Sequence, residues 1–176
     1  MNKRNADKGM MKPGMARLCF IAFIALELLA VNTIALAAEE ADDKLFSIIG
    51  RVVSVVSGDS IQMLLPDGER ISIQLAGIES PAPDDPIGHQ ARLWLHSQLN
   101  MQLVTAECMR LDDLLHCLVF PDDRNINLVS VYHGYSRLQG IERLVVDPQS
   151  YLQAERHARD TQVGVWNPGY QSAELD

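Results

Sequence analysis

Three strand-like segments precede the first helical pattern, and they constrain the fold more than any other feature of this chain. Residues 45–56 are rich in Ile and Val, whereas residues 59–65 and 71–75 alternate apolar with polar side chains. A Pro-Asp-Gly-Glu turn at 66–69 joins the second segment to the third. These segments predict a three-stranded meander at the start of the folded domain.

Helical patterns dominate the later part of the chain. After a loop with three prolines at 81–86, residues 88–100 predict a helix whose apolar face carries Ala91, Trp94, Leu95 and Leu99. A short helix is predicted at 127–133. A longer helix is predicted to start at Asp147-Pro148, to carry Tyr151, Ala154 and Ala158 on its apolar stripe, and to end at Gly164. The patterns alone therefore predict a small, strand-first α+β domain.

Residues 103–108 and 115–120 predict a hairpin that turns between Asp112 and Asp113. In that register two residues are paired when their numbers add up to 225, so Cys108 lies directly opposite Cys117. Directly opposed residues have Cα atoms about 4.5 to 5.5 Å apart, which a disulfide accepts. We therefore predict a Cys108–Cys117 disulfide. The alternative is two reduced, buried thiols.

The first 37 residues have the order of a secretory signal peptide. A basic segment is followed by the apolar residues 18–31 and then by Ala35-Leu36-Ala37, with the cut expected before Ala38. Cleavage would remove Cys19 and leave two cysteines, which favours pairing in an exported, periplasmic or secreted protein. The alternative is an uncleaved membrane anchor at 18–38, although Glu27 makes a stable span costly.

The predicted domain organisation follows from this leader. Residues 1–37 form the signal peptide, 38–44 a flexible lead-in, 45–168 the folded domain and 169–176 a C-terminal tail.

Removal of the leader makes the chain strongly acidic. The full chain has 15 basic and 23 acidic residues, and residues 1–37 hold 5 and 2 of these, which leaves 10 basic and 21 acidic residues and a net charge of −11. Affinity for nucleic acid comes mainly from Lys and Arg that neutralise phosphates. Strong DNA binding is therefore not expected, and contact with a membrane is expected only if the leader is uncleaved.

Two short motifs carry a family resemblance. They are Ser57-Gly58-Asp59-Ser60 and the segment 75–81, Leu-Ala-Gly-Ile-Glu-Ser-Pro, and together they resemble the staphylococcal nuclease (thermonuclease) family. Asp59 matches the second Asp of that family's Asp-Gly-Asp-Thr, while Glu79 and Ser80 match the Asp-Thr of its later motif.

Two later segments extend the resemblance to about residues 50–166. The segment 127–135 is similar to the family's Asn-x-x-Leu-Val-x-x-Gly-x-Ala, and the segment 151–166 is similar to its closing helix and Gly-Leu-Trp. The resemblance implies a five-stranded OB-fold barrel with about three helices.

The resemblance also implies a chemistry. In the family a calcium ion lies between two Asp carboxylates and a Thr backbone carbonyl, a Glu orients the attacking water, and two Arg side chains stabilise charge on the phosphate. The corresponding metal-site candidates here are Asp59, Glu79 and Ser80, and calcium is the implied cofactor.

The residues at the implied catalytic positions differ from the family pattern. Gln74 and Leu114 stand where the family has its two Arg residues, Ala82 stands where it has the Glu, and Ser57 replaces the first Asp. Loss of one transition-state donor costs about 100- to 1000-fold in rate, and loss of a general base costs about 100- to 10,000-fold. Asp84 or Asp85 is the alternative source of the missing carboxylate.

These departures favour a catalytically degenerate binding module for an unidentified protein or ligand. The alternatives are a weak calcium-dependent phosphodiesterase acting on nucleic acid, and oligonucleotide or oligosaccharide binding through the barrel face.

Overall fold

The computed structural model describes residues 45–111, 113–140 and 147–170, all of which belong to one contact unit, Asp42–Asp176. The predicted signal peptide, the alternative anchor at 18–38 and the lead-in at 38–44 lie outside the described residues, as does 171–176 of the predicted tail. Within the described ranges no helix has both the length and the apolar character needed to cross a bilayer.

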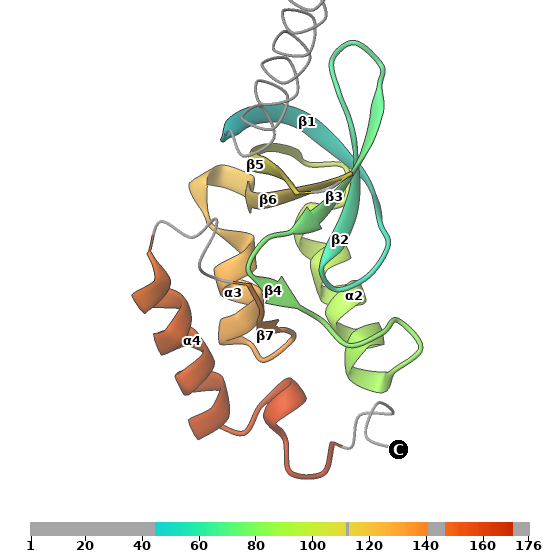
Figure 1. The fold of residues 1–176 in the computed structure, drawn as a ribbon. Coiled ribbons are helices and arrows are strands. Elements are labelled where there is room, and N and C mark those ends of the chain that lie inside the picture. Colours follow the sequence, from blue (N-terminus) through green and yellow to red (C-terminus); the bar gives the residue numbers. More distant parts are fainter. Residues whose placement is uncertain (1–44, 112, 141–146, 171–176) are drawn as a thin grey trace, which may run out of the picture. The chain divides into compact units, whose positions relative to one another are not determined.

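Five strands close into a barrel, and this confirms the predicted OB-fold-like α+β class (Figure 1). The strands are β1 (Phe46–Val55), β2 (Ser60–Leu64), β3 (Arg70–Leu75), β5 (Leu103–Leu111) and β6 (Leu114–Phe120). Their order around the barrel is β1-β2-β3-β6-β5, with β5 pairing back to β1. Every pair is antiparallel except β3–β6, which is parallel.

Alternation along the strands fills the barrel. Side chains of a strand point to opposite faces in turn, so one set from each strand faces the interior. The interior set is at most 2% exposed and includes Val52, Ile61, Met63, Ile73, Leu75, Val104, Ala106 and Val119. The predicted meander corresponds to β1-β2-β3, the three barrel strands that come first in the chain.

The β5–β6 hairpin has the predicted register. Its partners run from Thr105 opposite Phe120 to Leu111 opposite Leu114, and Cys108 lies opposite Cys117. These two cysteines form a disulfide with Cα atoms 4.1 Å apart, and neither has exposed surface. The predicted disulfide is confirmed, and it lies in the barrel core. The strands are longer than predicted because both extend toward the turn.

Helix α2 (Pro86–Leu99) begins two residues earlier than predicted. Proline suits the first helical position, and the Asp85 carboxylate caps the helix by accepting from the N–H groups of Ile87 at 2.8 Å and Gly88 at 3.3 Å. The helix buries Gly88, Ala91, Leu95 and Leu99. Asp85 is thus engaged in capping, and Pro86 belongs to the helix rather than to the loop.

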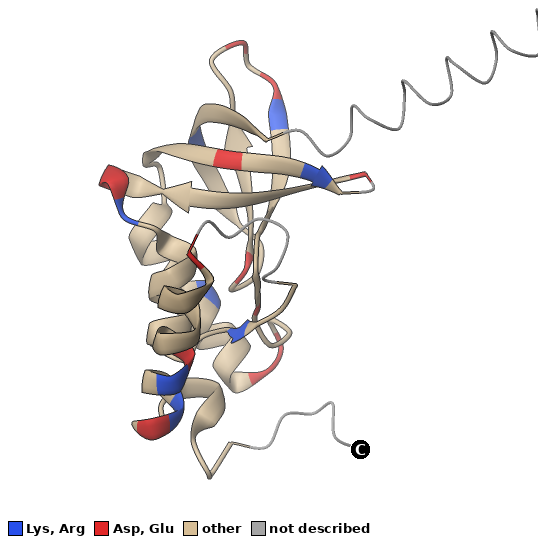
Figure 2. Cartoon of the chain, turned by 60° about the vertical axis from the view of Figure 1, so that its left-hand side comes forward, with Lys and Arg blue, Asp and Glu red and all other residues tan. Residues whose placement is uncertain are grey.

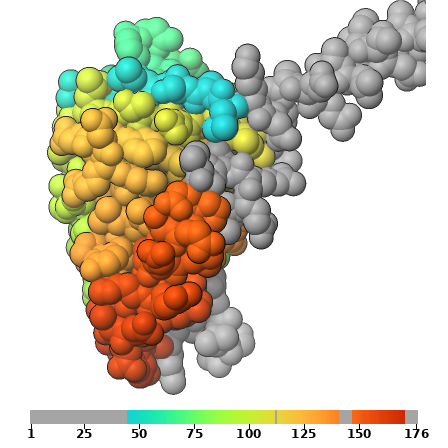
Figure 3. Space-filling view, turned by 90° about the vertical axis from the view of Figure 1, so that its left-hand side faces the viewer, coloured from blue at the N-terminus to red at the C-terminus, as the bar shows by residue number. Residues whose placement is uncertain are grey.

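Helices α3 (Ile126–Tyr132) and α4 (Pro148–Asp160) pack against each other, as Figure 3 shows for the face on which they lie side by side. Asn125 caps α3 through the N–H of Leu128, and Asp147 caps α4 through Ser150. The α4 helix ends at Asp160, before the predicted Gly164, which instead opens the 3-10 turn η2 (Gly164–Trp166). A second 3-10 turn, η1 (Pro121–Asp123), links β6 to α3.

A two-stranded ribbon was not predicted. It pairs β4 (Ile78–Glu79) with β7 (Arg137–Leu138), with Ile78 opposite Leu138 and Glu79 opposite Arg137. In Figure 1 the ribbon is drawn below the barrel strands, with α3 on its left and α2 on its right. It brings the segment after α3 next to the second family-like motif.

Candidate functional site

The first motif forms the turn between β1 and β2, and Gly58 allows that turn to pack closely. A Cβ atom at Gly58 would lie 2.5 Å from Ser80 Oγ and 2.6 Å from Ala91 Cβ, closer than such atoms approach. Only glycine therefore fits between the turn, Ser80 and helix α2. This packing sets Asp59 beside the second motif.

The Asp59 carboxylate is buried, with 8% of the residue exposed. Its Oδ1 accepts a hydrogen bond from the Ser57 hydroxyl at 2.6 Å, and its Oδ2 accepts from the Ser80 backbone N–H at 2.9 Å. Ser57 Oγ also lies 2.7 Å from Ser60 Oγ. Both carboxylate oxygens thus have a donor from the protein.

Ser80 continues this network on the other side. Its hydroxyl donates to the Tyr135 carbonyl at 3.0 Å and lies 2.6 Å from Ser136 Oγ, which is 2.8 Å from Ser130 Oγ. Ser130 and Ser136 have no exposed surface. We define the Asp59 cluster as Ser57, Asp59, Ser60, Ser80, Ser130 and Ser136.

Glu79 precedes Ser80 at the end of β4. The hydroxyls of Ser80 and Ser136 meet on one face of the β4–β7 ribbon, and neighbouring side chains in a strand point to opposite faces. Glu79 and its partner Arg137 therefore share the other face, where Glu79 is exposed and the Arg137 guanidinium lies 5.2 Å from the centre of the Trp166 ring. Of the predicted metal-site residues, Asp59 and Ser80 are joined by a hydrogen bond, while Glu79 pairs with Arg137 across the ribbon.

The Asp59 cluster by itself offers a calcium ion few ligands. Calcium takes six to eight oxygen ligands at about 2.3 to 2.6 Å. The Asp59 cluster has one carboxylate, and each of its oxygens accepts one hydrogen bond and keeps a second lone pair. Within 45–111, 113–140 and 147–170 no three acidic, His or Cys side chains are grouped so that they could hold a metal. Calcium binding stays a prediction for measurement.

The implied catalytic positions are spread over three elements. Gln74 is half-buried on β3, between Ser60 on β2 and His116 on β6. Ala82 is exposed in the loop before α2, and Leu114, 57% exposed, begins β6 at the hairpin turn. None of these three side chains can carry a charge, act as a base or neutralise a phosphate.

Sequence reasoning missed Ser130 and Ser136 as members of the Asp59 cluster. They follow Ser80 by 50 or more positions, and an isolated serine carries no periodic or spacing signal. The structure identifies them through the contact of Ser80 with Ser136 across the ribbon.

Helix α4 also contacts the β4–β7 ribbon. The buried Glu155 accepts from the Leu138 N–H at 3.1 Å and forms an ion pair with Arg159 at 2.9 Å. Tyr151, with 2% of its surface exposed, donates its hydroxyl to Asn125 Oδ1 at 3.1 Å. Burial raises the pKa of Tyr151 to about 12, although this hydrogen bond acts in the opposite direction.

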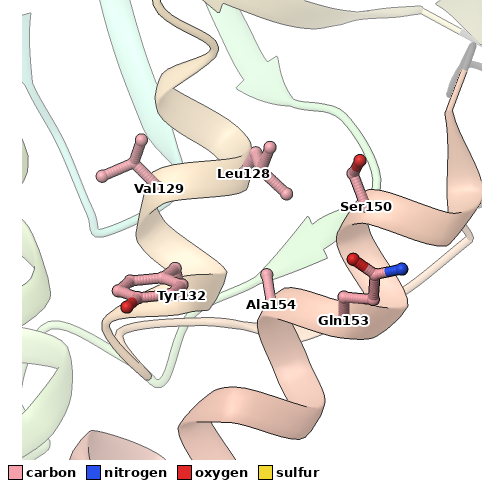
Figure 4. A pocket seen from close by; sticks show the side chains of 6 residues that line it. All are labelled: Leu128, Val129, Tyr132, Ser150, Gln153 and Ala154. Atoms are coloured by element: carbon pink, nitrogen blue, oxygen red, sulfur yellow. The ribbon is translucent and has the colours of Figure 1, made fainter.

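An apolar groove of about 330 Å³ runs between α3 and α4 (Figure 4). Leu128, Val129 and Tyr132 line it from α3, and Ser150, Gln153 and Ala154 line it from α4. At its end the Tyr132 ring stacks on His157 with centroids 4.0 Å apart. The groove is separate from the Asp59 cluster in its lining residues.

Comparison with known proteins gives one informative likeness. A protein described as an uncharacterized endonuclease, from Haemophilus influenzae (strain ATCC 51907 / DSM 11121 / KW20 / Rd), is 29% identical over 119 residues. The match covers 66% of this chain and 65% of that protein, so the chain spans less than two thirds of the relative's length. No family model matches the sequence. The likeness and the five-stranded barrel are together consistent with a nuclease-like fold.

Proposed function

We propose that this chain is an exported, catalytically degenerate member of the staphylococcal nuclease-like proteins that acts as a binding module. The observation that carries the proposal is the occupation of the three implied catalytic positions by Gln74, Ala82 and Leu114. The likeness to a protein named an endonuclease supports a nuclease-like origin. The geometry around Asp59 supports the loss of its metal-dependent chemistry.

Phosphodiester hydrolysis needs a positioned water, a cation and donors aimed at the developing charge. Asp59 retains a carboxylate, and each of its oxygens accepts a hydrogen bond from the protein. Of the two alternative sources of a general base, Asp85 caps α2 and Asp84 is exposed in the loop before this helix. Since two donors and a base are missing together, little of a nuclease's rate acceleration is expected to remain even if their effects are not additive.

A binding role is supported by surfaces that catalysis does not need. The groove between α3 and α4 is mostly apolar and also includes the polar groups of Tyr132, Ser150 and Gln153, a composition typical of ligand sites. The disulfide fits the oxidising compartment that an exported protein would reach. Intact-mass measurement of the exported protein tests the cut between Ala37 and Ala38, and retention of residues 18–38 would favour the anchor.

The decisive experiment is a nuclease assay. The purified protein is incubated with single- and double-stranded DNA, with and without calcium, and we expect no cleavage above a buffer control. The Asp59→Ala variant serves as the matched control for contaminating nuclease. Calcium-dependent cleavage that disappears in Asp59→Ala would overturn the proposal and establish the alternative, a weak calcium-dependent phosphodiesterase.

A further inference from the structure

We propose that Asp59 is a metal-independent clasp, in which the Ser57 hydroxyl and the Ser80 N–H take the place of the calcium ion that the family resemblance implies. The inference does not depend on whether the chain cleaves nucleic acid, because an inactive domain can still bind calcium.

The hydrogen bonds at Asp59 can stabilise its negative charge without a cation. Hydrogen bonds to a carboxylate are shorter and about twice as strong as those between neutral groups. The bond from Ser57 is 2.6 Å long and the bond from Ser80 is 2.9 Å long, with one donor on each carboxylate oxygen. A buried carboxylate needs such donors or a metal, and here the donors come from the chain itself.

The residue that provides the first donor is also the one that departs from the family motif. Ser57 stands where the family has an acid, which would be a second negative charge beside Asp59. Two carboxylates this close favour a bound cation, whereas a hydroxyl and a carboxylate satisfy each other without one. Ser57 thus gives Asp59 a donor from its own turn, which a second ionised carboxylate could not provide.

The clasp joins segments that are far apart in the chain. Asp59 holds the β1–β2 turn to Ser80 at the end of β4, and the Ser80 hydroxyl continues to Ser136 before β7. Ser136 in turn contacts Ser130 of α3. The barrel, the ribbon and α3 therefore meet at one network, so its loss is expected to lower the stability of the fold.

The first measurement is thermal unfolding of the full chain in EDTA and in about 10 mM calcium, above the weakest dissociation constants of extracellular calcium modules, about 1 mM. A site of that affinity would raise Tm by roughly 3 to 5 °C. We expect no calcium-dependent rise in the wild-type protein. A rise of this size that is lost in Asp59→Ala would overturn the proposal.

The second measurement compares variants in EDTA. We expect Ser57→Ala to lower Tm by about 3 to 5 °C and Asp59→Asn by about 5 to 10 °C, because buried charge-assisted bonds are lost. Ser57→Thr keeps the hydroxyl and is expected to stay closer to wild type than Ser57→Ala. Ser72→Ala, at an exposed serine of β3, is the matched control.

Two variants are needed because one of them could fail to fold. If Asp59→Asn does not fold, Ser57→Ala still reports the hydroxyl bond alone. A Tm of Ser57→Ala equal to that of Ser72→Ala would show that this bond does not stabilise the fold, and the clasp would be wrong.

Discussion

Asn127 shows how a single side chain holds together two parts of this domain. Its Oδ1 accepts from the Val119 N–H at 3.1 Å, and its Nδ2 donates to the carbonyls of Ala76 and Cys117, both at 3.0 Å. The residue has no exposed surface. Each buried backbone group left unpaired costs about 1 to 3 kcal/mol, so the amide of Asn127 stabilises β6 and the β3–β4 connection together.

Tyr151 gives a pH-dependent prediction at the same scale. Its pKa rises from 10.0 to about 12 in the folded protein because the phenol is buried. A group whose pKa is higher in the folded state stabilises the fold fully below its unfolded pKa and loses that contribution as pH rises through the folded pKa. We expect about 2 to 3 kcal/mol of stability to be lost between pH 10 and pH 12.

Urea unfolding at several alkaline pH values measures this loss. Tyr151→Phe is expected to remove the Tyr151 contribution to the pH dependence, at a cost near neutral pH of about 1 kcal/mol for the lost bond to Asn125. Tyr132→Phe, at a position 45% exposed, is the matched control for removal of a tyrosine hydroxyl. The same pH dependence in Tyr151→Phe and wild type would contradict the assignment.

At the scale of elements, the β5–β6 hairpin depends on its covalent link. The disulfide joins residues separated by 9 positions and is buried in the barrel. A loop of this length gives about 2 to 3 kcal/mol of stabilisation in the chain-entropy model. We expect reduction to lower the free energy of unfolding by about this amount, measured by urea titration with and without a reducing agent.

The control for reduction is the double variant Cys108→Ala/Cys117→Ala. It is expected to be less stable than wild type and insensitive to the reducing agent. Alkylation before reduction should label neither Cys108 nor Cys117, while Cys19 of the full chain reacts if the leader is present. Labelling of both hairpin cysteines without reduction would show that the bond does not form in solution.

At the scale of the whole molecule, charge limits the partners. The full chain carries a net charge of −8. The described ranges contain arginine but no lysine. Figure 2 shows the arginines spread over strands, loops and helices, with acidic residues at the hairpin turns and elsewhere. Few phosphates can be neutralised by such a distribution.

We therefore expect binding to random duplex DNA to be weaker than micromolar at about 0.15 M salt. Fluorescence anisotropy with a labelled duplex over a salt series measures both affinity and salt dependence. A protein that contacts few phosphates has a shallow dependence on salt. Micromolar or tighter binding with a steep salt dependence would contradict this prediction and favour the nucleic-acid alternatives.

Much of the fold was predictable because its signals are local. Alternation in 59–65 and 71–75 reports which side chains face a core. The turn predicted between Asp112 and Asp113 gives the register in which Cys108 lies opposite Cys117, as observed. Asp147-Pro148 marks a helix start because capping depends on neighbouring residues. The uncharged side chains of Gln74 and Leu114 could be identified without a structure, because side-chain identity is a property of the sequence.

Closure of the barrel and the composition of the Asp59 cluster were decided by tertiary structure. The parallel β3–β6 pair has no turn to mark it, and β4 and β7 are two residues long, too short for any periodic pattern. Ser80 and Ser136 are 56 positions apart, and their contact exists only because the ribbon pairs across the domain. Dihedral preferences and alternation act over a few residues, whereas these contacts depend on how the finished elements pack.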